Sequence, residues 1–107
     1  MIDRAIQITN KESVHARLSV FIAQIATLFK KCKISFFKED SDIEINAKSV
    51  MMILAVSISQ GEVITIHCDG VNEELALNSL FKLIVSEFNE AVYKQIMIDL
   101  KKELNIE

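Results

Sequence analysis

The sequence predicts an α+β fold, an open-faced sandwich in which a four-stranded antiparallel sheet carries three helices on one face. Two observations support this prediction. Strand-like and helix-like stretches follow one another in the order β-α-β-β-α-β-α, and each strand-like stretch is apolar on one side only. Antiparallel sheets with one packed face and one wetter face have this one-sided pattern. We expect a helical extension to follow at the C-terminus.

Four stretches show the two-residue period of half-buried strands: residues 2–9, 32–37, 42–46 and 62–68. The polar sequence "KEDSD" separates the second and third stretches and marks them as a hairpin. The residues expected to face inward are Ile2, Ile6 and Ile8, then Cys32, Ile34 and Phe36, then Ile43 and Ile45, and finally Ile64, Ile66 and Cys68.

Three stretches have helical spacing. From Ala16 to about Phe29, apolar residues recur at three- and four-residue steps. The compact run "KSVMMILAV" predicts a short helix with Ser49 near its N-cap, and a longer helix should begin near Asn72, also a favourable N-cap residue. The apolar stripe of this longer helix comprises Leu75, Leu77, Leu80, Phe81, Ile84 and Phe88.

We expect the last residues, 89–107, to form a helical extension to a domain that spans residues 1–88. A single helix from Asn72 to Leu104 would be about 50 Å long, which exceeds the diameter of a small domain. Either the chain breaks near Asn89 and folds back, for example over the open sheet face, or the extension pairs with a second copy as a homodimer. A frayed tail is the third alternative. We favour pairing, because the stripe resembles a helix–helix seam; its residues are Val92, Ile96, Leu100 and Leu104.

Composition excludes several classes of function. The net charge of −3 gives no electrostatic case for nucleic-acid binding. No apolar run reaches about 18 residues, so we expect no membrane insertion, and the N-terminus lacks the features of a signal peptide. Cys32 and Cys68 lie in strand-like runs without metal-ligand spacing, so buried free thiols are favoured over one disulfide, with no metal and no cofactor. These features predict a cytoplasmic protein.

Two motifs occupy fixed places in the order of elements. "VHARLS", residues 14–19, stands between the first strand and the first helix, and "NAKSVMMILAV", residues 46–56, stands between the third and fourth strands. A bare His-x-Arg would be weak evidence. Both motifs at this spacing, within residues 2–88, resemble the HPr family, the histidine-containing phosphocarrier proteins of the bacterial sugar phosphotransferase system.

The resemblance implies a phosphocarrier rather than an enzyme. His15 would accept a phosphoryl group from the first enzyme of the system, itself charged by phosphoenolpyruvate, and pass it to sugar-specific acceptor domains. Arg17 would steady the phosphoryl group. Ser49 matches the regulatory serine, whose partners would be a serine kinase and phosphorylase. Partners would dock through Ala16, Val50, Met51 and Leu54.

These residue types suit the chemistry. Histidine has an ordinary pKa of about 6.5, so much of it is neutral and nucleophilic at pH 7. A helix N-terminus disfavours the imidazolium, and it offers the N–H groups of Ala16 and Arg17 to phosphoryl oxygens. The guanidinium of Arg17 adds a fork of donors that matches phosphate.

Some residues depart from the family or have plainer interpretations. Ser13 and Leu18 stand where the family usually has glycine and proline. Two alternatives therefore stay open for this chain: a regulator with the same fold, or an interaction module without phosphoryl transfer. His15 could be an ordinary loop histidine and Ser49 a plain N-cap. We expect Met52 or Ile53 to be core, and His67 to be solvated on the open sheet face.

Overall fold

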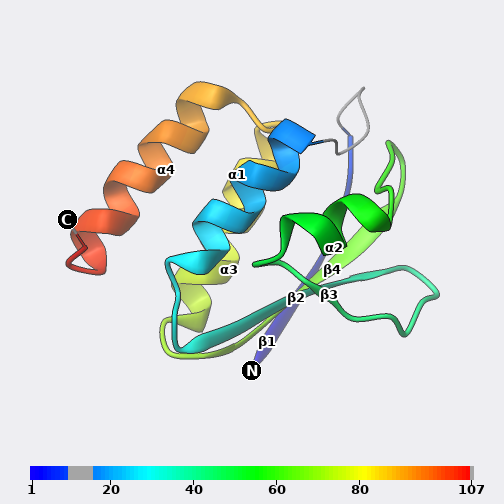
Figure 1. Ribbon diagram of the computed structural model, residues 1–107, viewed down its shortest axis with the longest axis horizontal. Coiled ribbons are helices and arrows are strands. Elements are labelled where there is room, and N and C mark those ends of the chain that lie inside the picture. The colour runs from blue at the N-terminus through cyan, green and yellow to red at the C-terminus, as the bar shows by residue number, and fades with distance from the viewer. Residues whose placement is uncertain (10–15, 107) are drawn as a thin grey trace.

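The computed structural model describes residues 1–9 and 16–106, and it confirms the predicted order of elements and the open-faced sandwich (Figure 1). The elements are β1 (Ile2–Gln7), α1 (Ala16–Thr27), β2 (Cys32–Lys38), β3 (Ile45–Asn46), α2 (Val50–Ala55), β4 (Val63–Gly70), α3 (Glu73–Val85) and α4 (Glu90–Glu103).

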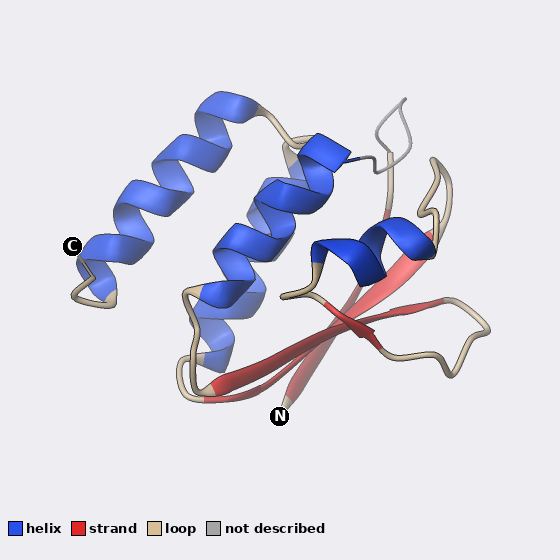
Figure 2. Cartoon of the chain, in the orientation of Figure 1, coloured by secondary structure: helices blue, strands red, loops and turns tan. Residues whose placement is uncertain are grey.

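The four strands form one antiparallel sheet in the order β1-β4-β2-β3. β4 is a central strand, because it pairs with β1 from Ile2↔Cys68 to Gln7↔Val63 and with β2 from Cys32↔Gly70 to Lys38↔Ile64. All four helices lie on the same side of this sheet (Figure 2). The opposite face is left open, as the one-sided patterns predicted.

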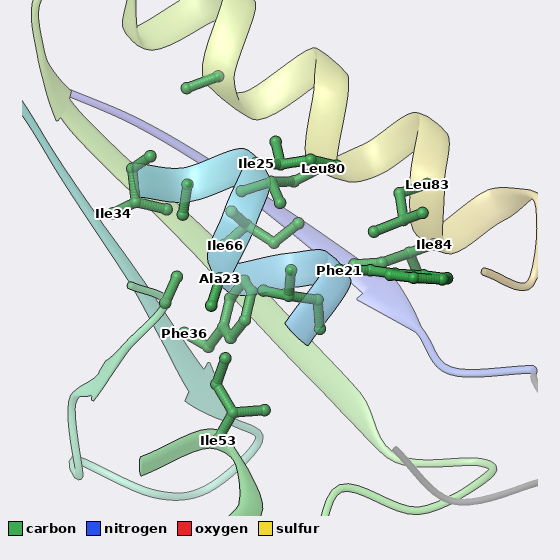
Figure 3. Packing of buried hydrophobic residues seen from close by; sticks show 14 of the residues in the cluster. Phe21, Ala23, Ile25, Ile34, Phe36, Ile53, Ile66, Leu80, Leu83 and Ile84 are labelled. Atoms are coloured by element: carbon green, nitrogen blue, oxygen red, sulfur yellow. The ribbon is translucent and has the colours of Figure 1, made fainter. Parts of the chain in front are cut away.

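The hydrophobic core lies between the sheet and the helices (Figure 3). Phe36 and Ile66 reach it from the sheet, and Ile25, Ile53 and Leu80 reach it from α1, α2 and α3, each with at most 1% of its surface exposed. The alternation predicted for β2 and β4 is therefore confirmed, and so is the prediction that Ile53 belongs to the core. Cys32 and Cys68 are buried free thiols, as expected.

The third strand is shorter than predicted. β3 pairs with β2 at Ser35↔Asn46 and Phe36↔Ile45. Ile43, expected to face inward, is 66% exposed. The hydroxyl of Ser41 accepts a hydrogen bond from the Ile43 amide at 3.2 Å, a local turn that competes with strand pairing.

The two predicted N-caps have different outcomes. Ser49 caps α2, since its Oγ accepts a hydrogen bond from the Met52 amide at 3.2 Å. Asn72 precedes α3 but makes no side-chain cap, because its backbone is left-handed with φ 61°. The carboxylate of Glu73 instead accepts a hydrogen bond from the Gly70 amide at 3.2 Å. The predicted start of this helix is therefore confirmed with Asn72 at the N-cap position, although its side chain makes no capping hydrogen bond.

The C-terminal extension folds back near Asn89, which is one of the three predicted alternatives and not the favoured one. Glu87 and Phe88 adopt left-handed φ values of 58° and 59°, which reverses the chain after α3. α4 then packs against α1 and α3, on the helical side of the domain and not over the open sheet face (Figure 1). Ile96 and Leu100 are 4% and 2% exposed, so the stripe that favoured a homodimer is already covered within this chain.

Candidate functional site

His15 and Ser13 lie outside the described residues, whereas Arg17, Leu18 and Ser19 of the same motif are described. Arg17 is in the first turn of α1, with 59% of its side chain exposed. Leu18 and Ser19 follow it, and both are buried. The first turn is therefore anchored through Leu18, at the position where the family usually has proline. The first N–H groups of an α-helix lack acceptors within the helix, so this end of α1 suits an anion.

Arg17 lies beside the C-terminal extension. Its Nη2 is 3.3 Å from Oε2 of Glu90, and its guanidinium carbon is 5.4 Å from the centroid of the Phe21 ring. Phe21 stacks on Tyr93 of α4, with ring centroids 4.0 Å apart and planes 9° apart. No local pattern in the sequence predicts these contacts, because Arg17 and Glu90 are 73 residues apart.

Tyr93 joins α4 to α1 by a polar contact as well. Its hydroxyl donates a hydrogen bond to the side-chain oxygen of Gln24. Burial raises the pKa of the Tyr93 phenol, so the hydroxyl stays protonated and able to donate at neutral pH. The first turn of α4 is thereby fixed next to the middle of α1.

The predicted docking residues of α2 differ in exposure. Met51 is 76% exposed, whereas Val50 and Leu54 are half-buried. Met52, which we expected to compete with Ile53 for the core, is 41% exposed and extends the apolar surface. α2 packs beside α1, whose exposed Ala16 begins the helix. We call the exposed side chains of Met51 and Met52 the methionine surface.

Lys48, which sequence reasoning did not single out, fixes the segment before Ser49. Its ammonium donates hydrogen bonds to the carbonyl oxygens of Phe29 at 2.6 Å and Cys32 at 2.7 Å. These carbonyls follow the C-terminus of α1, where a positive charge is favoured. The N-cap of α2 is therefore tied to the end of α1 and the start of β2.

Other titratable groups do not form a second reactive site in the described part of the chain. Among those residues, no three His, Cys, Asp or Glu side chains gather as a metal site. Burial raises the pKa of Cys32 and raises that of Cys68 to about 12, so both thiols stay protonated and unreactive. His67 is not simply solvated as expected, because its Nδ1 lies 2.6 Å from Oδ1 of Asp3. No helix in the described ranges is long and apolar enough to cross a membrane.

Comparison with known proteins identifies the family. Residues 2–86 match the family model described as the phosphotransferase-system HPr component phosphorylation site. Phosphocarrier protein HPr of Neisseria meningitidis is 36% identical and that of Xylella fastidiosa 33% identical, each over 84% of this chain and 98% of its own length.

A solved structure agrees with this match. The HPr-C-His structure from Thermoanaerobacter tengcongensis superposes with a TM-score of 0.75 at 36% identity, and the match covers 82% of this chain and 96% of that one. The chain therefore belongs to the HPr family of the phosphotransferase system, whose members are phosphocarrier proteins and not enzymes.

Proposed function

We propose that this chain receives a phosphoryl group on His15 from the first enzyme of the phosphotransferase system and passes it to sugar-specific acceptor domains in the cytoplasm. The observation that carries the proposal is the exposed guanidinium of Arg17 in the first turn of α1, two residues after His15. We propose residues 1–88 as the transfer unit and residues 89–107 as a separate extension.

Transfer requires a nucleophile whose new bond breaks again readily. An unprotonated ring nitrogen of His15 supplies an electron pair to phosphorus, while the donor atom keeps the pair of the bond that breaks. The other ring nitrogen keeps its proton. Arg17 offers two N–H donors to the phosphoryl oxygens throughout. Such exposed contacts are each worth roughly 0.5–3 kcal/mol, enough to steady the group without trapping it.

The transfer proposal is tested by labelling. The protein is incubated with phosphoenolpyruvate and the organism's first phosphotransferase enzyme, and the product is mapped by mass spectrometry. We expect acid-labile phosphate on His15 and none in His15→Ala. Arg17→Ala should slow phosphorylation of His15. Arg4→Ala should not, because Arg4 belongs to β1 and its guanidinium lies over the ring of Phe81 in α3. An unlabelled wild-type protein would leave the alternative, an interaction module without phosphoryl transfer.

We propose that partners dock on Ala16, Val50, Met51 and Leu54. The methionine surface next to α1 supports this, because flexible apolar side chains adapt to different partners. Met51→Glu should weaken transfer about tenfold, which corresponds to roughly 1–2 kcal/mol for a docking residue. Ile43→Glu is the matched control, since Ile43 is also exposed but lies in the hairpin loop. Equal effects of both substitutions would argue against this surface.

We further propose that phosphorylation of Ser49 by a serine kinase weakens docking. The phosphate would remain at the N-terminus of α2, where its charge is tolerated, but it would add about −2 of charge beside Met51 and Met52. Ser49→Asp should accept phosphate on His15 more slowly, with a small change in melting temperature. Ser57→Asp, just beyond the C-cap of α2, should load like wild type. Wild-type loading of Ser49→Asp would contradict this regulation.

A further inference from the structure

The C-terminal extension brings a carboxylate to the arginine of the transfer site. α1 and α4 begin at the same end of the molecule and run side by side (Figure 1). Asn89 caps α4, since its Oδ1 accepts a hydrogen bond from the Val92 amide at 3.1 Å. Glu90 is the first residue after that cap, and Oε2 of its carboxylate lies 3.3 Å from Nη2 of Arg17.

The position of Glu90 is imposed by packing and does not depend on its own ion pair. One turn further along α4, Tyr93 stacks on Phe21 and donates a hydrogen bond to Gln24. Two turns further, Ile96 is buried with 4% of its surface exposed. These contacts hold the start of α4 against α1. The backbone of Glu90 therefore stays beside the first turn of α1, within reach of Arg17, whether or not the ion pair is formed.

We propose that Glu90 is a positioning residue that competes with the phosphoryl group for Arg17. This inference rests on the proposed transfer through His15. In the unloaded protein, Glu90 holds the guanidinium. In the loaded protein, Arg17 must exchange the carboxylate for phosphoryl oxygens. Glu90 thereby lowers the affinity of the site for the phosphoryl group and favours its onward transfer.

The expected size of the effect follows from exposure. The side chains of Arg17 and Glu90 are 59% and 56% exposed, and exposed ion pairs contribute little because water screens them. Glu90→Gln should therefore shift the phosphoryl equilibrium between donor enzyme and carrier by about two- to fivefold toward the carrier. The shift should shrink in 1 M salt, where the screening length is about 3 Å.

The test measures how phosphate distributes at equilibrium between the first enzyme and wild type, Glu90→Gln or Glu90→Lys. Glu90→Lys should shift the equilibrium at least as far in the same direction, because it repels Arg17. Glu103→Gln removes the same charge from the far end of α4 and should behave like wild type. The effect of Glu90→Gln should vanish in an Arg17→Ala background, which a general change in packing would not produce.

The outcomes separate the two proposals. If wild type is loaded on His15 and Glu90→Gln distributes phosphate as wild type does, this inference is overturned and the transfer proposal stands. The same conclusion follows if the shift survives in Arg17→Ala or equals that of Glu103→Gln. If wild type is not loaded, the transfer proposal fails and this inference fails with it.

Discussion

The sheet with α1 and α3, and the helix α4 that lies beside them, are stabilised in different ways. In the first region, strands paired along their length bury side chains such as Phe36, Ile66 and Leu80 completely. In the second, Ile96 and Leu100 are the buried side chains of α4, and polar contacts at its start complete the attachment. The comparison indicates that the sheet with α1 and α3 supplies most of the buried core, whereas α4 joins the same core through a narrow strip of contacts.

The largest effect should come from the core of the first region. Phe36→Ala removes a ring with 0% exposure between the sheet and the helices, and it should cost about 3–5 kcal/mol of unfolding free energy. Phe37 follows it on β2 with its side chain half-buried and turned edge-on toward His67. Phe37→Ala should cost clearly less in urea denaturation. Equal losses would mean that the open face contributes as much as the packed one.

A smaller global effect is expected from the attachment of α4. Ile96→Ala should weaken docking of α4 by about 2–4 kcal/mol and increase hydrogen exchange throughout that helix, while the amides of β2 and β4 remain protected. Ile98 is 49% exposed on the same helix, so Ile98→Ala should leave exchange unchanged. Simultaneous loss of protection in the sheet and in α4 would show that the two regions unfold as one unit.

A substitution in the turn that links the two regions should increase the stability of the chain. Glu87 has a left-handed φ of 58° in the turn between α3 and α4, a conformation that disfavours residues with a Cβ atom. Glu87→Gly should therefore stabilise the chain by about 0.5–1 kcal/mol. Glu74→Gly, inside the first turn of α3, should destabilise it by a similar amount. Thermal unfolding of both variants tests this, and a lower melting temperature for Glu87→Gly would contradict it.

Most of the fold could be predicted from residue periodicity. β2 and β4 keep their most apolar residues on every second position, and α1 has a continuous apolar stripe, so the pattern predicts which faces are buried. The turn at Glu87 contains neither glycine nor proline, so a break near Asn89 was predicted only as one alternative, from the length that an unbroken helix would have. Ile43 was misplaced because its alternation with Ile45 continues beyond the last pair with β2.

The site was predictable to a different extent. The motif around Arg17 and the cap at Ser49 were identified in the sequence because both are local. The contact of Arg17 with Glu90 is made across most of the chain length, and it depends on how α4 docks. The position of Lys48 depends likewise on carbonyl groups brought close by folding. No periodicity records such contacts, so the sequence could not reveal them.

The smallest predicted effect concerns pH and lies within the first region. Lys38 and Glu62 form an ion pair at 2.8 Å, and the hydrogen bond from Lys38 holds the pKa of the Glu62 carboxyl below its usual range. A lowered pKa stabilises the folded state above the ordinary carboxyl value of about 4.3, and this contribution disappears as pH falls through the lowered pKa. At pH 7 the unfolding free energy of wild type should exceed that of Glu62→Gln by at most about 1 kcal/mol.

This difference in unfolding free energy should disappear when thermal unfolding is measured at progressively lower pH below about 4. Glu39→Gln is a suitable control, because Glu39 is an exposed residue that directly follows β2. If the difference between wild type and Glu62→Gln stayed constant across this pH range, the lowered pKa of Glu62 would not be the source of the stabilisation.

The strand order has a consequence for biosynthesis. β1 lies at an edge of the sheet and pairs with β4. The paired residues Ile2 and Cys68 are separated by more than half of the chain. At about 5–20 residues per second, a ribosome synthesises β4 roughly 3–12 s after β1. β1 therefore waits without its partner while α1, β2 and α2 emerge. The nascent chain completes its sheet only when β4 appears, and α4 joins a domain whose strands have already been synthesised.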